Sequence, residues 1–326
     1  MLKQAVLIME CSRIFSLPTT IFSWLVIFVY SLINSGNISY GLVAFVGLVF
    51  AHLGTNLLDD YFDYKYLIKR VDFDRTEYLK CSQKTKCRYL ISGKMLEFGL
   101  LRLAGIYFLV ASICGLFLFL KCGIGVLYFA IVGAIIALIY PIASRICLSE
   151  LMVGLAYGPA LFGGVYYVMC GTYSVDVFLL SIPTMLMTII LLFVHTIMDY
   201  DFDIAEGKKT LANIFKSKSV SLKILKWLLI FSYLSIFIEC IFDILDWQIF
   251  FVCLTIPMAV DLYKYLSKFI EDSESLPQKK WYHFPMENLK EFEKRNEASF
   301  MVRMFQSRNL MMYFSIIITI AIFCTM

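Results

Sequence analysis

Charged side chains are scarce in this sequence, and their scarcity decides the class of protein. Only 17% of the 326 residues are charged, whereas 60% are hydrophobic and the mean hydropathy is +0.77. Soluble globular domains carry about 25% charged residues, so a water-soluble globule is excluded. The formal net charge of +4, from 29 Lys and Arg against 25 Asp and Glu, is too small to indicate a nucleic-acid partner.

Several sequence signatures are also absent. The ten cysteines contain no CxxC pair and no zinc-finger spacing, which leaves buried thiols as the simplest interpretation. The sequence contains neither a P-loop nor an HExxH motif. A DGxxAR core is missing too, which excludes the CDP-alcohol phosphotransferases. A cleaved signal peptide is not expected, because no small-residue cleavage site precedes the first long apolar run.

The sequence does have long apolar runs of about 17–23 residues, the length of a helix that crosses about 30 Å of hydrocarbon. The alternating segments that form outer-membrane barrels do not occur. We therefore predict an all-α integral membrane protein with about nine transmembrane helices around a central cavity. The predicted spans are 17–34, 41–58, 98–120, 124–142, 151–170, 177–198, 223–244, 248–265 and 309–325.

Basic residues are concentrated in alternate loops. Nine lie between 64 and 94, six between 208 and 226, and nine between 264 and 308. The turns in between contain only Lys121. By the positive-inside rule the charged loops are cytoplasmic, and the cavity opens to that face. We expect a protein of the bacterial inner membrane with a cytoplasmic N-terminus and an outer C-terminus.

The domain organisation is simple. No linker long enough to separate soluble domains interrupts the spans, so residues 1–326 are predicted to form one transmembrane domain. The longest polar stretch, about 266–308, is predicted to be a connector. Its amphipathic piece at 286–300 carries Leu289, Phe292 and Phe300, which would lie on the bilayer surface in one interpretation. A solvated connector is the simpler interpretation.

Two groups of aspartates end apolar runs. Asp59 and Asp63 follow the second span, and Asp199 and Asp203 follow the sixth. On a continuing helix, carboxylates four residues apart share one face and repel each other. The two pairs are offset by the same 140 residues, which suggests two similar halves. A divalent cation explains such pairs, and Mg²⁺ suits them because it combines one or two carboxylates with phosphate oxygens. The implied partner is a diphosphate.

Basic residues follow each acidic pair, and we predict that they bind the diphosphate oxygens that the metal does not reach. They are Lys65, Lys69, Arg70, Arg75 and Arg88 after the first pair, and Lys208 and Lys209 after the second. For each single residue, an ordinary positive-inside charge or a helix cap is the alternative. His52 and His195 precede the acids; helix packing is the simpler interpretation of both, and a general-base role stays open for His195.

The acidic pairs and their surroundings resemble the UbiA superfamily of intramembrane prenyltransferases. NLLDDYFDYK at 56–65 is similar to the NLxNDYxD motif of the menaquinone-type branch, and MDYDFDIAEGKKTLA at 198–212 is similar to the second family motif. CRYLISGKM at 87–95 resembles an RPxPSG segment, and YPIASR at 140–145 resembles YPxxKR. Residues 148–168 and 308–318 resemble members that prenylate naphthoate, so the similarity covers most of the chain.

The resemblance implies an enzyme that transfers a polyprenyl group from polyprenyl diphosphate to an aromatic acceptor and releases pyrophosphate. The residues that it assigns to Mg²⁺ are Asp59 or Asp60, Asp63, Asp199 and Asp203. It also implies that Asn56 orients a metal ligand or the acceptor, and that Tyr140 and Arg145 bind substrate. The isoprenoid tail would lie between helices, in contact with the bilayer.

The acceptor is less constrained than the reaction. The closest likeness is to the menaquinone-type branch, which implies 1,4-dihydroxy-2-naphthoate. Asp59 stands where the family usually has asparagine, and Met198 where naphthoate enzymes usually have arginine, so 4-hydroxybenzoate or another lipid or quinone precursor stays open. An ion-coupled transporter is the alternative of another class, although the acids here lie at helix ends on one face. Isoprenoid length and oligomeric state stay open.

Overall fold

The structure is a computed structural model that describes residues 2–71, 73–80, 87–287, 289–294 and 297–324. Within these ranges every regular element is helical, and nine helical segments are long and apolar enough to cross a membrane. The prediction of an all-α membrane protein with about nine spans is confirmed.

The spans are built from one, two or three helical elements each. They are η1 (Ile14–Ser16) with α2 (Pro18–Ile33), α3 (Ile38–Leu67), α6 (Glu97–Cys122), α7 (Gly125–Ala143), α8 (Ser149–Leu155) with η2 (Ala156–Ala160) and α9 (Leu161–Cys170), α10 (Val175–Met198), α12 (Lys218–Ile241), η3 (Trp247–Thr255) with α13 (Ile256–Glu271), and α15 (Ala298–Phe323). The shorter elements are α1 (Leu2–Cys11), α4 (Arg75–Lys80), α5 (Arg88–Ile91), α11 (Tyr200–Ala205), η4 (Trp281–His283) and α14 (Leu289–Lys294).

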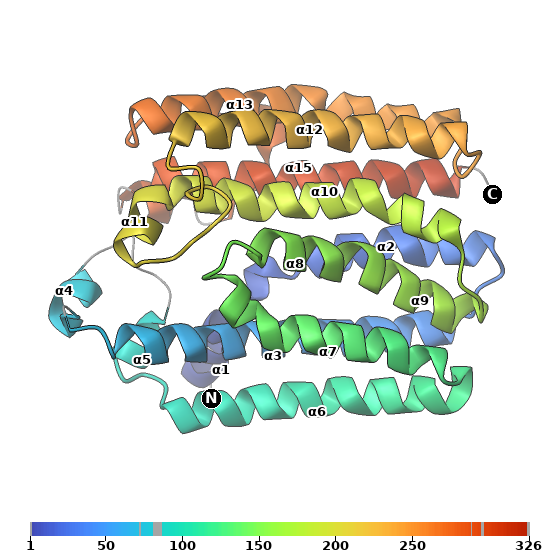
Figure 1. Ribbon diagram of the computed structural model, residues 1–326, viewed down its shortest axis with the longest axis horizontal. Helices are drawn as coiled ribbons and strands as arrows, with labels where there is room; N and C mark the ends of the chain where they lie inside the picture. The colour runs from blue at the N-terminus through green and yellow to red at the C-terminus, as the bar shows by residue number, and fades with distance from the viewer. Residues whose placement is uncertain (1, 72, 81–86, 288, 295–296, 325–326) are drawn as a thin grey trace.

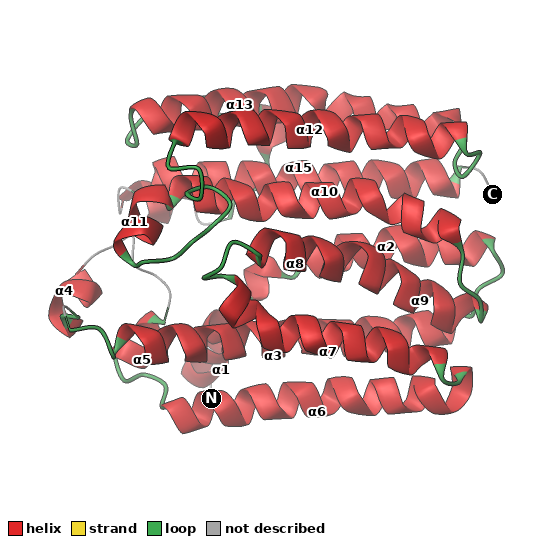
Figure 2. Cartoon of the chain, in the orientation of Figure 1, coloured by secondary structure: helices red, strands yellow, loops and turns green. Residues whose placement is uncertain are grey.

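The spanning helices lie side by side with roughly parallel axes (Figure 1). The loops that follow α3, α7, α11 and α13 gather at one end of the bundle together with α4, α5 and α11. We call this the loop end. Short turns close the opposite end (Figure 2). The loops in which the basic residues concentrate therefore share one end of the molecule.

The second span is longer than the sequence predicts. We expected it to end at residue 58, but α3 continues to Leu67. The charges that suggested an end lie inside the protein, since Asp59 and Asp60 are each 1% exposed. A hydropathy average treats these carboxylates as exposed to water and therefore ends the span before them. In the structure, side chains from other segments of the chain pair with them.

The last span differs from its predicted bounds for a related reason. α15 begins at Ala298 instead of residue 309. Its Arg303 is fully buried and donates to the carbonyl oxygens of Tyr265 and Ser275, at 2.9 Å each. These hydrogen bonds satisfy the guanidinium, so the helix includes a charge that ended the predicted span.

One apolar core joins the early and late helices. Its buried members include Trp24 and Ile27 of α2, Phe162 of α9, Phe193 of α10, Leu225 of α12, Leu262 of α13 and Phe314 of α15. Leu109 and Leu116 of α6 and Leu138 of α7 are exposed, as side chains in contact with lipid would be. Nine of the ten cysteines are free thiols in the described ranges, and Cys81 lies outside them.

The fifth span is interrupted in its middle. The π-helical turn η2 separates α8 from α9, and Gly158 has non-helical angles of φ −96° and ψ −108°. Pro159 has no N–H with which to continue the hydrogen-bond ladder. A Cβ at residue 158 would stand 2.7 Å from the Cβ of Met185 on α10, so glycine permits a close approach. The turn carries Tyr157, which contacts His52 of α3.

The polar connector is shorter than predicted. It runs from 272 to 297 between α13 and α15, whereas we expected about 266–308, because the flanking helices extend into that stretch. Leu289 and Phe292 pack against the small cluster of Met286, Val302 and Phe305. These two residues therefore contact the protein with part of their surface, and their position relative to the bilayer surface stays a prediction. Residues 288, 295 and 296 of the same piece lie outside the described ranges.

A buried polar cluster fixes the connector to α13 and α15. Lys280 and Tyr282 each donate to the carboxylate of Asp261 at 2.7 Å. Nε2 of His283 lies 3.1 Å from the same carboxylate. The backbone N–H of Lys280 donates to Nδ1 of His283 at 3.2 Å, and Nε2 of Gln306 lies 3.1 Å from it. We therefore assign the proton of a neutral His283 to Nε2.

We expect the stability of the protein to fall on acidification because of His283. Burial lowers the pKa of this imidazole below its ordinary value of 6.5, although the Asp261 carboxylate acts in the opposite direction. As the pH falls through about 6.5, the unfolded chain takes up a proton that the folded protein resists. Stability that is present above this pH is therefore lost below it. In detergent, Tm should decrease between about pH 7.5 and about pH 5.5, by about 2–4 °C for each kcal/mol lost.

The matched variant is His283→Gln, which keeps a donor toward Asp261 but does not titrate. Its Tm should decrease less than that of the wild type over the same pH range. An equal decrease in both proteins would show that His283 is not responsible.

Candidate functional site

Residues beside the two acidic motifs are in contact at the loop end. Arg145, just after α7, donates from Nη2 to Oδ1 of Asp63 at 2.9 Å, and its guanidinium lies 3.6 Å from the ring centroid of Tyr66. One turn further along the chain, Arg70 donates to the carbonyl of Ala205 at 3.5 Å. Because Ala205 belongs to α11, Arg70, which follows the first motif in the chain, contacts the segment that carries the second.

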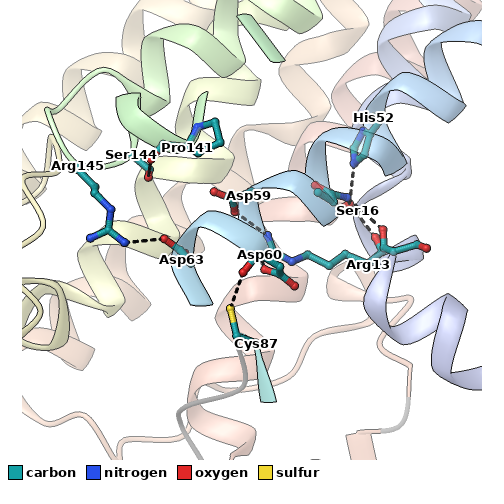
Figure 3. A network of polar contacts seen from close by, with 12 residues as sticks. Arg13, Ser16, His52, Asp59, Asp60, Asp63, Cys87, Pro141, Ser144 and Arg145 are labelled. Carbon is teal, nitrogen blue, oxygen red and sulfur yellow. Dashed lines mark hydrogen bonds and ion pairs between the residues drawn. The ribbon is translucent and has the colours of Figure 1, made fainter. Parts of the chain in front are cut away.

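Three aspartates of the first motif lie on one stretch of α3. Asp59 and Asp60 are 1% exposed and Asp63 is 7% exposed. Arg13 contacts the first two: its Nη1 lies 3.3 Å from Oδ2 of Asp59, and its Nη2 pairs with Asp60 (Figure 3). Tyr89 donates to Oδ2 of Asp60 at 2.6 Å. Buried charges require such partners, so these side chains stabilise the ionised motif.

Arg13 is a member of this site that the sequence analysis missed. It lies 46 and 47 residues before the acids that it contacts. Its backbone is left-handed, with φ and ψ both at 50°, a conformation that costs a non-glycine residue about 1–3 kcal/mol. The available signal was a lone arginine before the first apolar run, which the positive-inside rule explains without a site.

Asn56 lies one helical turn before Asp60 on α3. Its Nδ2 donates to the carbonyl of Ser12 at 3.2 Å and to Oγ of Ser16 at 3.1 Å. An amide nitrogen has two protons to donate, so both are used on the N-terminal segment. The structure thus fixes the orientation of the Asn56 amide, and its role toward metal or acceptor stays a prediction.

The second motif does not lie on one continuing helix, as its spacing suggested. Asp199 occupies the C-cap of α10 with φ −89° and ψ 10°, and α11 begins after it. The N–H of Asp203 still donates to the carbonyl of Asp199 at 2.8 Å. Asp203 is 6% exposed, whereas the side chain of Asp201 is 78% exposed and pairs with Lys218. Asp203 therefore belongs to the interior of the motif and Asp201 to its surface.

The basic residues predicted to bind phosphate are spread over the loop end. Lys65 pairs with Glu97 in the first turn of α6, and its Nζ lies 5.6 Å from the ring centroid of Tyr61. Arg88 donates to the carbonyl of Leu79 at 2.5 Å. Arg75 is exposed at the start of α4. Arg145 directly contacts Asp63 of the first motif.

The loop after the second motif lies against the segment that follows α7. Lys208 pairs with Glu206 at 2.9 Å. Lys209 is exposed, and its carbonyl accepts from the N–H of Cys147 at 2.6 Å. Tyr140 is half-buried in the last turn of α7. Lys208 and Lys209 therefore follow Asp203 on a loop that the Arg145 segment holds in place.

Glu150 is a second residue, after Arg13, whose role beside the site the sequence analysis missed. It is 2% exposed, and its Oε1 accepts from Oγ1 of Thr196 at 3.1 Å and from the N–H of Leu211 at 3.3 Å. Ser149 donates to Oε2 at 2.8 Å. One carboxylate thus joins the start of α8 to α10 and to the loop after the second motif.

The donor chemistry of the motifs fits Mg²⁺. No three His, Cys, Asp or Glu side chains in the described ranges lie close enough together to hold an ion as the side chains stand. Mg²⁺ does not need such a cage, because it usually takes one or two carboxylates and keeps waters or phosphate oxygens. Arg13 pairs with Asp59 and Asp60, and Arg145 pairs with Asp63. Positive charge therefore lies beside these buried carboxylates.

The fold is similar to several solved structures. A structure of digeranylgeranylglyceryl phosphate synthase matches with a TM-score of 0.59 at 16% identity, covering 98% of this chain and 99% of that one. A UbiA homologue from Archaeoglobus fulgidus bound to GPP and Mg²⁺ matches with 0.58 at 12% identity, covering 96% and 99%. The apo UbiA homologue from Aeropyrum pernix K1 matches with 0.55 at 17% identity, covering 94% and 97%. At these identities the similarity establishes the fold.

Sequence comparison agrees with the fold. A 4-hydroxybenzoate octaprenyltransferase of Francisella tularensis subsp. mediasiatica is 27% identical over 217 residues, which are 66% of this chain and 69% of that protein. The enzyme of the same name from subsp. novicida is similar to the same extent. The model of the UbiA prenyltransferase family matches residues 16–289. Because this match covers most of the chain, the protein belongs to the UbiA prenyltransferase family.

Proposed function

We propose that this protein transfers a polyprenyl group from a polyprenyl diphosphate to an aromatic acceptor, in a reaction that depends on Mg²⁺. The observation that carries the proposal is the contact at the loop end between segments beside the two acidic motifs. Arg145 pairs with Asp63 of the first motif, and Cys147, two residues later, donates to the carbonyl of Lys209 in the loop after the second motif. Ionisable groups near a bilayer are costly and are kept for function. The similar fold from Archaeoglobus fulgidus binds GPP or DMAPP with Mg²⁺, which supports the same ligand class here.

Each group of site residues has a role in this proposal. The metal ligands are Asp59 or Asp60, Asp63, Asp199 and Asp203. Bound Mg²⁺ would neutralise the charge that develops on the leaving pyrophosphate. Arg145, Lys208 and Lys209 bind the remaining phosphate oxygens. The bond between the allylic carbon and the diphosphate oxygen breaks, the acceptor ring forms the new carbon–carbon bond, and that ring carbon loses a proton or a carboxyl group.

Two acceptors have support from different observations. The likeness of residues 148–168 and 308–318 to naphthoate-prenylating enzymes favours 1,4-dihydroxy-2-naphthoate and menaquinone biosynthesis. The similar Francisella enzymes are named for 4-hydroxybenzoate, which favours that acceptor and a ubiquinone-type pathway. The comparisons do not support a special relation to the menaquinone branch. We therefore give 4-hydroxybenzoate the first place and keep the naphthoate as the second candidate.

The orientation in the membrane follows from charge. The loop end carries the loops in which the basic residues concentrate, and the positive-inside rule places such loops in the cytoplasm. We propose that the diphosphate enters from that side of an inner membrane while the isoprenoid tail stays among the spanning helices.

The test is an assay of the purified protein with a radiolabelled polyprenyl diphosphate and Mg²⁺, with each acceptor in a separate tube. Product with 4-hydroxybenzoate that disappears on addition of EDTA is the expected result. Product with the naphthoate alone would keep the reaction and change the acceptor. Uptake of an ion by proteoliposomes, without product from either acceptor, would favour the transporter instead.

A further inference from the structure

A hydrogen-bonded cluster extends from the first acidic motif into the interior of the bundle. His52 of α3 is 8% exposed and lies at its centre. Its Nε2 lies 2.7 Å from Oγ of Ser16 in η1. Its Nδ1 lies 2.6 Å from Oγ1 of Thr20 on α2 and 2.6 Å from the hydroxyl of Tyr157 in η2. Asn56, one turn along α3, donates to the same Ser16 oxygen at 3.1 Å.

The donors and acceptors give each of these hydrogen bonds a direction. The hydroxyl proton of Ser16 goes to the carbonyl of Arg13 at 2.8 Å. The Ser16 oxygen must then accept from Nε2 of His52, so we assign the ring proton to that nitrogen. Nδ1 is left as the acceptor for a hydroxyl proton from Tyr157 or Thr20. His52 is thus a neutral imidazole whose tautomer is fixed by neighbours on three other segments of the chain.

The cluster connects a break in the fifth span with the candidate site. Tyr157 reaches His52 from the π-helical turn at Gly158, and turns of this kind occur frequently at functional sites. At the other end, Ser16 holds two groups that belong to the site. One is the Asn56 amide, and the other is the backbone carbonyl of Arg13, the residue with left-handed angles that contacts Asp59 and Asp60.

We propose that His52 is a positioning residue for the transfer reaction. By holding Ser16, it sets the orientation of the Asn56 amide and the backbone geometry from which Arg13 reaches the first acidic motif. The Arg13 backbone sets the place of the positive charge beside the motif, and the Asn56 amide sets the dipole that lies one turn before Asp60. Together they determine the affinity for the Mg²⁺ diphosphate. This inference rests on the proposed function, because it assumes that the motif holds that ligand.

The test compares the wild type with two variants of His52 in detergent. His52→Leu removes the donor to Ser16, whereas His52→Gln places an amide N–H close to the position of Nε2. The readouts are the calorimetric affinity for geranyl diphosphate in Mg²⁺ and the Mg²⁺ concentration at half-maximal turnover. Loss of a residue that orients metal ligands typically weakens metal binding about 10–100-fold. We expect that loss in His52→Leu, and recovery to within about threefold of the wild type in His52→Gln.

A second pair of variants keeps the proposal testable when His52→Leu does not fold. Ser16→Ala removes the oxygen on which the cluster converges and should weaken the same two quantities. Ser232→Ala is its matched control, because this buried hydroxyl donates to Leu228 of its own helix at 2.8 Å, away from the motif. Unchanged affinity and Mg²⁺ dependence in His52→Leu and Ser16→Ala, with a wild type that binds the ligand, would overturn the positioning role. A wild type that does not bind geranyl diphosphate in Mg²⁺ would overturn the proposed function and this inference with it.

Discussion

Asp63→Asn should lower the rate of prenyl transfer by about 10²–10³-fold while the protein stays folded. The substitution keeps the shape of the side chain and removes the negative charge that is proposed to hold the metal. It also removes the ion pair with Arg145, whose Nη2 lies 2.9 Å from Oδ1 of Asp63. Asp199→Asn should have an effect of the same size from the second motif. The measurement is turnover of radiolabelled polyprenyl diphosphate at saturating Mg²⁺, with Tm recorded for each variant.

The second motif provides a matched control. Asp201 lies between Asp199 and Asp203 in sequence, but its side chain is 78% exposed and pairs with Lys218 at the surface. Asp201→Asn changes the formal charge by the same amount as the other two substitutions. Exposed ion pairs contribute little, so its activity should stay within about twofold of the wild type. Full activity of Asp63→Asn or Asp199→Asn would contradict the assignment of the site.

Arg13→Met should have the largest effect on stability, and only when divalent cations are absent. It leaves Asp59 and Asp60, each 1% exposed, without the guanidinium that contacts both. Removing one partner of a buried ion pair typically costs about 3–5 kcal/mol. We therefore expect a markedly lower Tm in EDTA. Mg²⁺ should raise Tm more in the variant than in the wild type, because ligand binding to the folded state stabilises it and the ion replaces the missing charge.

Arg13→Lys separates the charge from the geometry of the guanidinium. Lysine keeps one positive charge but lacks the planar fork that contacts two carboxylates at once. Its Tm in EDTA should lie between those of the wild type and Arg13→Met. Equal Tm values for all three proteins in EDTA would mean that Arg13 does not stabilise the acids.

Hydropathy and motif spacing predicted the number of spans and the end of the molecule at which the acids lie. Hydropathy and motif spacing are local properties of the sequence. A run of apolar residues has to be helical in lipid, because only a helix satisfies its backbone hydrogen bonds there. The bounds failed where a charge is neutralised by a distant segment. α3 passes through Asp59 and Asp60 because of Arg13, and α15 includes Arg303 because of the connector carbonyl at Ser275. A short sequence window does not include the distant residues that neutralise these charges.

Only part of the candidate site could be predicted from the sequence, because some of its residues are brought together by distant segments of the chain. The aspartates could be found because their spacing repeats within the chain, and Arg145 because it lies in a motif that resembles a family segment. Arg13 lies in no such segment. Tyr89 and Glu150 lie in segments that resemble the family, but their partners are distant in sequence and are reached only through tertiary packing. The break at Asp199 was also hidden, because a four-residue spacing fits both a continuing helix and a helix with a cap at its first acid.

The distance in sequence between Arg13 and its acids has a consequence for membrane insertion. During synthesis, α2 leaves the ribosome and reaches the bilayer before Asp59 and Asp60 do, since these acids come 46 and 47 residues after Arg13. At that stage Arg13 is a positive charge flanking the first span, and such charges keep their side of the membrane cytoplasmic. In the proposed orientation, the same guanidinium serves first as an orientation signal for the nascent chain. It becomes a counterion inside the finished protein only when α3 arrives beside it.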